Sequence, residues 1–420
     1  MFEALHPLGD AFWLDSGPGG RAFLGTGERV VLPAGEVLAT LRHELDAVRV
    51  DGPLGAVPLG LVGWFGYELR GETTGMPVRE RGALPDAAFL RVDRLLVVEA
   101  DATAELLALG AAWEGELAEW RHTVLQVVEE RAAGTRLETA GPTSSPTSPP
   151  IWRDDDATYL ANVRACQAAI HEGEAYQLCL TTEARVEGAF EPLAVFDAVR
   201  ASSATHHGGL IRIGDVALVS ASPERFLEVT PDRVVRTSPI KGTRPRDPRP
   251  DEDARLRGEL VASEKERAEN LMIVDLMRND LSRVCEIGSV AVTRLLEVES
   301  YRHVHQLVST IEGALLPGLG AVDAVAACLP AGSMTGAPKL RAIELLDALE
   351  QRPRGPYAGA FGYLAADGSA DLAMTIRTIV IDPDGASVGA GGGITALSVP
   401  EEELAEAHLK AAALLAALTA

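Results

Sequence analysis

Two pairs of glutamates have the spacing of a cation-binding site. Glu266 and Glu269 lie three residues apart in a helix-like segment, and Glu403 and Glu406 repeat that spacing near the C-terminus. Side chains at i and i+3 share one face of a helix, so each pair presents two carboxylates together. Two such pairs beside buried helix faces could hold one hard divalent cation such as Mg²⁺. Taken alone, each pair is more often a solvated helix face or a capping arrangement.

A lysine that could act as a nucleophile stands in the segment Pro-Ile-Lys-Gly-Thr-Arg-Pro-Arg at residues 239–246. Lys241 precedes Gly-Thr on a turn after a strand-like run, where its side chain can be held rigidly. A lysine amine becomes nucleophilic when burial or a neighbouring charge lowers its pKa. A solvated loop lysine is the simpler interpretation of this segment by itself.

Three further segments could bind or activate a ligand. Glu224, in Ser-Pro-Glu-Arg-Phe at 222–226, could be a general acid, although a lone Glu between strands is usually solvated. The glycines within 389–395 let backbone N–H groups approach an anion, and a plain tight turn explains them as well. The Gly- and Pro-rich loop at 330–339 opens a helix, whose N-terminus and hydroxyl groups could bind a ligand.

The composition limits the partners of the chain. It has 420 residues, with 61 acidic side chains against 38 basic ones and a formal net charge of −23. A chain this acidic is a poor general binder of nucleic acid or of anionic membranes, and an anionic ligand would need locally concentrated positive charge. The N-terminus lacks signal-peptide features, and no uncharged apolar run is long enough to span a bilayer. We therefore expect a soluble cytoplasmic protein.

The four cysteines are widely spaced and form no Cys-x-x-Cys motif. This spacing argues against a disulfide framework and against a zinc site. We expect Cys166, Cys179, Cys285 and Cys328 to be buried thiols in a reducing compartment.

One boundary is visible along the chain. Residues 134–151, rich in Gly, Ser, Thr and Pro, predict a linker or a long surface loop. This segment separates an N-terminal part, residues 1–133, from a C-terminal region, residues 152–420.

The periodicity of apolar residues favours strands that come in adjacent pairs, with helices between them. Strands are predicted at 59–69, 89–98 and 372–381, among others, and one long helix from about 251 to 277. Paired strands and intervening helices favour antiparallel sheets with packed helices, an α+β fold.

Together and in this order, these motifs resemble the chorismate-utilising enzymes. That family includes anthranilate synthase component I, aminodeoxychorismate synthase component I, and the isochorismate and salicylate synthases. The resemblance runs from about Trp152 to the C-terminus and is weaker before it. It implies a two-layer antiparallel α+β core flanked by helices, to which both parts of the chain contribute. The segments that carry it are 222–226, 239–246, 264–284, 330–342, 389–395 and the pair Glu403 and Glu406.

The resemblance also implies chorismate as substrate and Mg²⁺ as cofactor, held by the four glutamates named above. Glu224 matches the acid that assists loss of the ring C4 hydroxyl. Tyr363, Arg377 and the amides of residues 391–393 match groups that hold the enolpyruvyl carboxylate. The full set of matched positions that bind or frame the substrate is Gly242, Thr243, Thr335, Tyr363, Arg377, Gly391, Gly392, Gly393 and Lys410.

Three positions indicate the branch of the family. Lys241 stands where anthranilate and isochorismate synthases usually have Ala. Gln177 stands where isochorismate and salicylate synthases carry a water-activating Lys. Gln306 stands where anthranilate synthases usually have a His linked to pyruvate elimination. All three resemble the aminodeoxychorismate synthases.

The activity that this resemblance implies is the conversion of chorismate and ammonia to 4-amino-4-deoxychorismate through a covalent Lys241 intermediate, for p-aminobenzoate and folate synthesis. No glutaminase module is evident in the sequence, so a separate glutamine amidotransferase subunit is expected to supply the ammonia. Two alternatives stay open. The chain could be an anthranilate synthase component I, or a catalytically inactive homologue that binds chorismate or supports a partner subunit.

Overall fold

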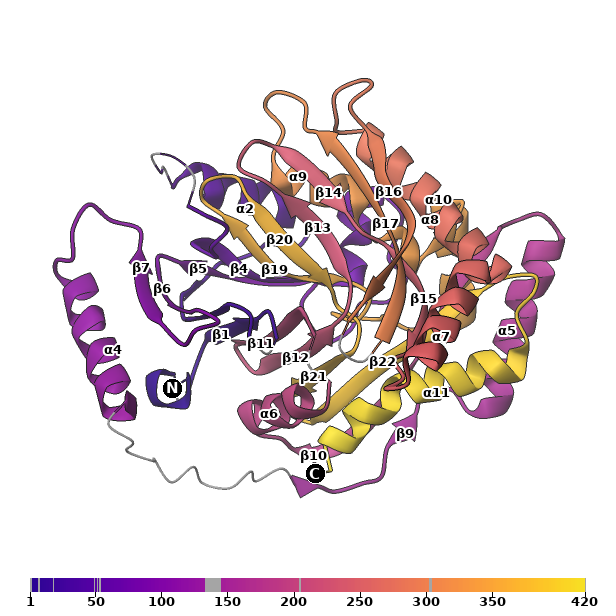
Figure 1. The fold of residues 1–420 in the computed structure, drawn as a ribbon, viewed down its shortest axis with the longest axis horizontal. Coiled ribbons are helices and arrows are strands. Elements are labelled where there is room, and N and C mark those ends of the chain that lie inside the picture. Colours follow the sequence, from indigo (N-terminus) through magenta and orange to yellow (C-terminus); the bar gives the residue numbers. More distant parts are fainter. Residues whose placement is uncertain are drawn as a thin grey trace.

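The computed structural model describes residues 2–6, 8–17, 19–48, 50, 52, 54–132, 145–203, 205–301 and 304–419. Two antiparallel sheets pack face to face, and helices cover the outer face of each (Figure 1). The predicted α+β fold with a two-layer antiparallel core is confirmed.

The first sheet, sheet A, has the strand order β18-β10-β22-β21-β12-β11-β1-β2-β6-β7, and β8 and β9 also pair with β10. Its strands are β1 (Ala11–Asp15), β2 (Ala22–Gly25), β6 (Arg94–Val98), β7 (Ala104–Ala108), β8 (Ser145–Pro146), β9 (Ile151–Trp152), β10 (Gln177–Ala189), β11 (His207–Ile213), β12 (Val216–Ser222), β18 (Gly336–Ala337), β21 (Thr378–Asp382) and β22 (Gly385–Ile394).

The second sheet, sheet B, has the order β15-β17-β14-β13-β20-β19-β4-β5-β3, and β16 pairs with β17. Both sheets therefore contain strands from before and after residues 133–144. The strands of sheet B are β3 (Glu28–Arg29), β4 (Gly60–Phe65), β5 (Ala87–Val92), β13 (Arg225–Val229), β14 (Val234–Thr237), β15 (Ile240–Pro245), β16 (Ala291–Ser300), β17 (Val304–Ala314), β19 (Ala360–Ala365) and β20 (Ala370–Met374).

Three apolar clusters hold these layers together. One lies between the sheets and contains Phe12, Trp64 and Phe361. The second packs α5, α6, α10 and α11 on sheet A, and the third packs α2, α8 and α9 on sheet B. The helices are α1 (Phe2–Leu5), α2 (Val37–Asp46), α3 (Arg70–Thr74), α4 (Glu116–Ala132), α5 (Asp156–His171), α6 (Pro192–Ser202), α7 (Pro250–Ala262), α8 (Glu264–Ser282), α9 (Ala321–Cys328), α10 (Lys339–Glu350) and α11 (Pro400–Ala417), with short 3₁₀ turns η1 (Tyr67–Leu69) and η2 (Gly332–Met334).

Two of the runs that were predicted as single strands each contain parts of two strands, and these two strands belong to different sheets. The run 372–381 contains the end of β20 in sheet B and most of β21 in sheet A, and the run 89–98 divides in the same way between β5 and β6. The run 59–69 forms a strand only as far as Phe65. These predictions were wrong about where each strand ends. Both sheets bury the same kinds of apolar residue, so the composition does not show where the chain passes from one sheet to the other.

The single helix predicted from 251 to 277 is also two helices. Ser263 has an extended backbone, with ψ 108°, and ends α7. Its side chain accepts a hydrogen bond from the Glu266 N–H and so caps the N-terminus of α8. The break allows α8 to take its own direction across sheet B, with Glu266 in its first turn.

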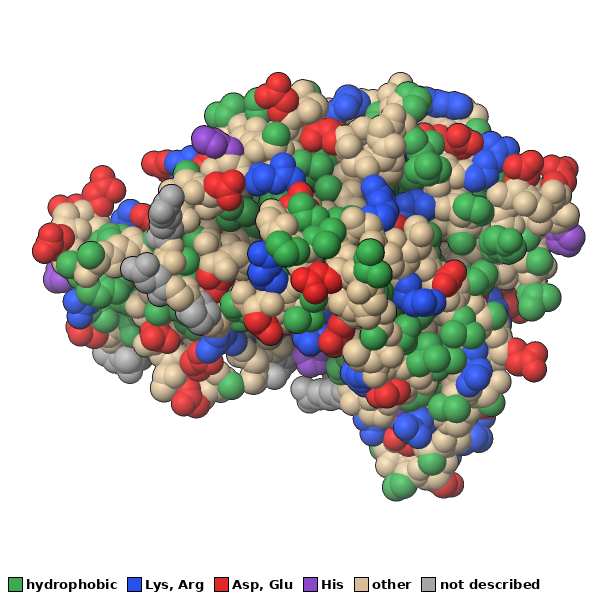
Figure 2. Space-filling view, turned by 90° about the horizontal axis from the view of Figure 1, so that it is seen from above, with side chains coloured by type: hydrophobic (Ala, Val, Ile, Leu, Met, Phe, Trp, Pro, Cys, Tyr) green, Lys and Arg blue, Asp and Glu red, His purple; other side chains and the backbone are tan. Residues whose placement is uncertain are grey.

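The predicted linker lies only partly within the described residues. Residues 134–144 fall outside them, and within 145–151 the chain forms β8 and begins β9, both paired with β10. The four cysteines are free and buried, as predicted. Among the helices of the described ranges, none is long and apolar enough to cross a membrane. On the face shown in Figure 2, acidic and basic side chains are interspersed.

Candidate active site

Strand β15, at the edge of sheet B, presents Lys241. Its pairing with β17 shifts register between Ile240 and Thr243, and Gly242 lies at this irregularity with φ +85°. A Cβ on Gly242 would lie 2.7 Å from Leu260 and 2.9 Å from Glu266, so both the backbone and the packing require glycine here. The Lys241 side chain reaches sheet A, where its Nζ lies 3.4 Å from the point that a Cβ on Gly393 would occupy.

The four glutamates converge beside this lysine, from α8 on sheet B and α11 on sheet A. Glu269 and Glu403 are buried. Burial raises the pKa of Glu269, Lys241 and Lys265 oppose that rise, and the neighbouring charges of Glu266 and Glu403 add to it. The charges of Glu266 and Glu403 both act on Glu269, so the i,i+3 pair on α8 and the pair on α11 lie on the same side of the molecule, within electrostatic range of each other.

Lysines and an arginine pair with these carboxylates in the structure. Lys265 Nζ lies 3.3 Å from Glu403 Oε1, and Lys410 Nζ lies 2.6 Å from Glu406 Oε1. Burial raises the pKa of Glu406, but the hydrogen bond and charge of Lys410 and the charges of Lys265 and Lys241 outweigh this effect. The pKa of Glu406 is therefore lowered. Arg244 Nη1 approaches Glu266 Oε1 at 3.6 Å. Within the described ranges, no three His, Cys, Asp or Glu side chains gather closely enough to hold a metal ion. The donor chemistry, four carboxylates of which two are buried, nevertheless fits a hard divalent cation.

Glu224 lies in the short connection between β12 and β13 and is 8% exposed. Its Oε1 accepts a hydrogen bond of 3.1 Å from Ser333 Oγ, in the loop that precedes α10. Burial raises the pKa of Glu224 to about 7, and Lys241, Ser333 and Lys410 hold it from rising further. A carboxyl group with a pKa near neutrality can carry a proton into the site and release it during a reaction.

The glycines of residues 389–395 lie within strand β22, so a tight turn is the wrong interpretation. Gly391 pairs with Thr181 on β10, and a Cβ there would lie 2.2 Å from the Leu180 carbonyl oxygen. Lys410 Nζ donates to the Gly391 carbonyl at 2.8 Å, and the Lys410 carbonyl accepts from Arg377 Nη1 at 3.1 Å. The residues expected to hold a carboxylate, 391–393 with Arg377 and Lys410, are therefore linked to one another.

The two predicted threonines differ in their surroundings. Thr335 is fully buried, and its hydroxyl donates to the Ala331 carbonyl at 3.1 Å, so it shapes the loop before α10. Its own carbonyl accepts from the Cys179 N–H at 2.8 Å, which ties that loop to β10. Thr243 is exposed on β15, opposite Gln306 on β17.

Residues 9–416 match the family described as chorismate binding enzyme. The chain belongs to this family. It is 41% identical over 401 residues to an aminodeoxychorismate synthase of Streptomyces pristinaespiralis, covering 91% of this chain and 54% of that protein. It is 38% identical over 417 residues to anthranilate synthase component 1 of Mycolicibacterium smegmatis, covering 95% and 79%. The crystal structure of anthranilate synthase component I from Streptococcus pneumoniae matches with a TM-score of 0.80 and 29% identity, over 97% of this chain and 91% of that one. The chain thus spans about half the length of the first of these relatives.

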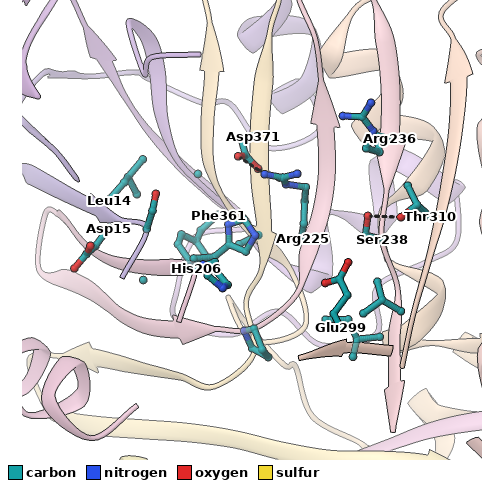
Figure 3. A pocket seen from close by; sticks show the side chains of 18 of the residues that line it. Leu14, Asp15, His206, Arg225, Arg236, Ser238, Glu299, Thr310, Phe361 and Asp371 are labelled. Carbon is teal, nitrogen blue, oxygen red and sulfur yellow. Dashed lines mark hydrogen bonds and ion pairs between the residues drawn. The ribbon is translucent and has the colours of Figure 1, made fainter. Parts of the chain in front are cut away.

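In this chorismate-binding enzyme, Tyr363 lies apart from Arg377 and the glycine strand. It lines a cavity of about 640 Å³ between the sheets, where Arg225 and Asp371 form an ion pair of 3.0 Å (Figure 3). The assignment of Tyr363 to the substrate carboxylate is therefore corrected. Alternation along β19 turns its side chain, like that of Phe361, toward the space between the sheets. Ile240, which precedes Lys241 in the sequence, and Pro223, which precedes Glu224, also line this cavity.

The tyrosine at the site is Tyr357, which the sequence analysis missed. It precedes β19, is buried, and its ring would contact a Cβ on Gly389 at 2.2 Å. Burial raises the pKa of its hydroxyl, and Arg377 is near enough to oppose that rise. The two tyrosines are six residues apart, and both have Gly and Ala as neighbours in the sequence. They differ in that Tyr357 precedes the strand β19, whereas Tyr363 lies within it.

The two glutamines used to distinguish branches of the family are both buried. Gln177 begins β10, is 1% exposed and lies next to Gly393. Gln306 lies on β17, is 8% exposed and pairs across the sheet with Thr243. Lys241, Glu224, Gln177 and the four glutamates thus come from both sheets to one place.

Proposed function

We propose that the chain is the chorismate-aminating component of an aminodeoxychorismate synthase, which converts chorismate and ammonia to 4-amino-4-deoxychorismate. The observation that carries the proposal is the position of the Lys241 amine. It lies close enough to Glu224 and Glu269 to influence the pKa of both carboxyl groups, and it faces the glycine strand at Gly393. A lysine so placed has the geometry of a nucleophile beside an acid.

In the proposed reaction, the Lys241 amine adds to C2 of the chorismate ring. The ring double bonds shift, and the C4 hydroxyl leaves as water with the proton of Glu224, whose pKa near 7 suits this task. Ammonia then adds at C4, the double bonds shift back, and Lys241 is released from C2. Two substitutions with a good nucleophile replace one difficult substitution, which is the advantage of covalent catalysis. The net reaction is an amination of the transaminase class.

Glu266, Glu269, Glu403 and Glu406 would hold Mg²⁺ in this proposal. The cation would supply positive charge to the ring carboxylate of a dianionic substrate in an acidic protein. The support for this role is the convergence of four carboxylates from α8 and α11, with Glu269 raised in pKa by its acidic neighbours as well as by burial. Displacement of Lys265 and Lys410 from Glu403 and Glu406 would free those oxygens for the cation.

A glutamine amidotransferase subunit or domain would supply the ammonia. Support comes from the four cysteines, all buried and therefore unsuited to attack glutamine, and from the relative of which this chain covers only 54%. The free thiols agree with a reducing compartment such as the cytoplasm. The product would feed p-aminobenzoate and folate synthesis.

Anthranilate synthase component I is the second candidate, because the chain covers 79% of such a relative from M. smegmatis. The two activities give different products from the same substrates. The test is to incubate the pure chain with chorismate, Mg²⁺ and an ammonium salt and to identify the product by mass. We expect 4-amino-4-deoxychorismate, whereas anthranilate, which is aromatic and fluorescent, would establish the second candidate. No turnover of chorismate would contradict both.

A further inference from the structure

The chain contains few lysines, and most of them lie at the site. Of its 38 basic side chains, 34 are arginine and only four are lysine. The charges of Lys241, Lys265 and Lys410 all act on Glu406, and the fourth, Lys339, lies in a buried ion pair. Arginine grips a carboxylate with two parallel N–H groups, whereas lysine carries a compact ammonium group that water solvates strongly. Lysine is therefore the basic side chain that leaves a carboxylate more easily.

The four glutamates differ in their ion pairs. Three of them have a basic partner, namely Lys265 for Glu403, Lys410 for Glu406 and Arg244 for Glu266. Glu269 has no such partner among the described residues, although it is only 7% exposed. The charges of Lys241 and Lys265 reach it only from beyond ion-pair distance. A buried carboxylate is costly without a direct partner, so this part of the site calls for more positive charge.

Lys265 is held only weakly at its carboxylate. Among the described residues its Nζ has one partner, Glu403 Oε1 at 3.3 Å, and its side chain is 40% exposed. It is also the second residue of α8, where the helix dipole opposes a positive charge. Lys410 is held more firmly, since its Nζ bonds both to Glu406 at 2.6 Å and to the Gly391 carbonyl at 2.8 Å. Of these two lysines, Lys265 is thus the one that can pass into water with the smaller loss.

We propose that Lys265 is a displaceable counter-cation of the four glutamates, which Glu403 exchanges for Mg²⁺ when the metal binds. This inference rests on the metal role in the proposed function. Glu403 is one of the proposed ligands, so the ammonium group and the metal compete for the same carboxylate. The amine keeps its proton in the exchange and moves into water. Lys265 thereby lowers the affinity for Mg²⁺, and it stabilises the crowded carboxylates as long as no metal is bound.

The test measures Mg²⁺ binding by calorimetry for the wild type, Lys265→Met and Lys265→Arg, with Arg164→Met as a matched control. Methionine removes the charge at similar length, and arginine keeps the charge but can hold the carboxylate with two N–H groups. Arg164 pairs with Glu401 at 3.1 Å near the start of α11, so its loss removes one positive charge without freeing any of the four glutamates. Each protein is freed of metal with a chelator and titrated with MgCl₂ at fixed pH and ionic strength. Thermal unfolding is followed in EDTA and in excess MgCl₂.

We expect Lys265→Met to lower the Kd for Mg²⁺ by roughly fivefold or more, the ordinary size of a coupling between two bound groups, and Lys265→Arg to raise it. Arg164→Met should keep the wild-type Kd. In EDTA, Lys265→Met should unfold at a lower temperature than the wild type, because the carboxylates lose a counter-charge. Excess Mg²⁺ should remove this difference, since a ligand stabilises most the protein that binds it most tightly.

An unchanged Kd for Lys265→Met would overturn the inference, as would an equal change in Arg164→Met, which would reflect net charge alone. Equal Kd values for Lys265→Arg and the wild type would also overturn it, because they would make Lys265 a charge that the metal does not displace. A loss of stability that Mg²⁺ does not repair would assign the lysine a purely structural role. If neither the wild type nor Lys265→Met binds Mg²⁺, the metal role in the proposed function fails, and the inference fails with it.

Discussion

The replacement Glu224→Gln should stabilise the protein while it removes activity. In the wild type, burial raises the pKa of Glu224 from its ordinary 4.5 to about 7. A carboxyl group whose pKa is raised by folding binds its proton more tightly in the folded state, so its ionisation opposes folding. The stability is full below about 4.5 and declines as the pH rises to about 7. This difference in pKa corresponds to about 3 kcal/mol of unfolding free energy.

The glutamine side chain of this variant would be neutral at every pH and nearly the same size as the glutamate that it replaces. The stability advantage of the variant over the wild type should therefore grow by about 2 to 3 kcal/mol between about pH 5 and pH 8.5. Urea unfolding of both proteins at these two pH values measures the gain. Activity with ammonium should fall by about 10²- to 10⁴-fold, the usual contribution of a general acid.

Serine at position 333 provides the control for this prediction. Ser333→Ala removes the 3.1 Å hydrogen bond to Glu224 but leaves the carboxyl group buried. This variant should be slightly less stable than the wild type, and its stability should still decline as the pH rises. A stability gain for Glu224→Gln that is the same at both pH values would refute the reasoning, since it would mean that Glu224 ionises in the folded protein as it does in water.

Three other predictions concern the remaining chemistry. Lys241→Ala should lower the rate of 4-amino-4-deoxychorismate formation by orders of magnitude while changing stability little. Product analysis by mass is expected to show at most a trace of an adduct at C2, formed by direct addition of ammonia. If the variant made the same product at a near wild-type rate, Lys241 would have no catalytic role. Glu269→Gln should weaken Mg²⁺ binding, measured by calorimetry, and lower activity with the fold intact, and activity that survives in excess EDTA would contradict a metal requirement. The isolated chain should use ammonium salts, better at higher pH where free NH₃ rises, and should fail with glutamine as donor; efficient use of glutamine by the chain alone would show that no separate amidotransferase is needed.

The positions of several candidate residues within the fold could be predicted from the sequence, because these residues lie in short segments with a local pattern. The i,i+3 spacing of Glu266 and Glu269 fixes their common face wherever the helix packs, and Glu224 lies between two strands as its segment suggests. The exception was Tyr363. Its side chain lines the cavity between the sheets, whereas that of Tyr357 lies against Gly389 of the glycine strand. The sequence does not show where β19 begins, and so it did not distinguish the two tyrosines.

The continuity of the elements was less predictable, because it depends on packing between distant segments. The chain passes from sheet B to sheet A between Met374 and Thr378, and Arg377 at this corner has φ +50°. Local apolar pattern is the same on both sides of such a corner. The glycines of β22 likewise give no strand signal of their own, since their conformation is fixed by β10 and β21 on either side.

The strand order of sheet A has a consequence for synthesis of the chain on the ribosome. Strands β21 and β22 lie between β10 and β12 in the sheet, yet they are made long after both. Until residue 394 has emerged, β10 and β12 have exposed edges that other chains could pair with. The site is completed later still, when α11 brings Glu403 and Glu406 to the glutamates of α8. The candidate site of a nascent chain is therefore incomplete until residue 406 has been made.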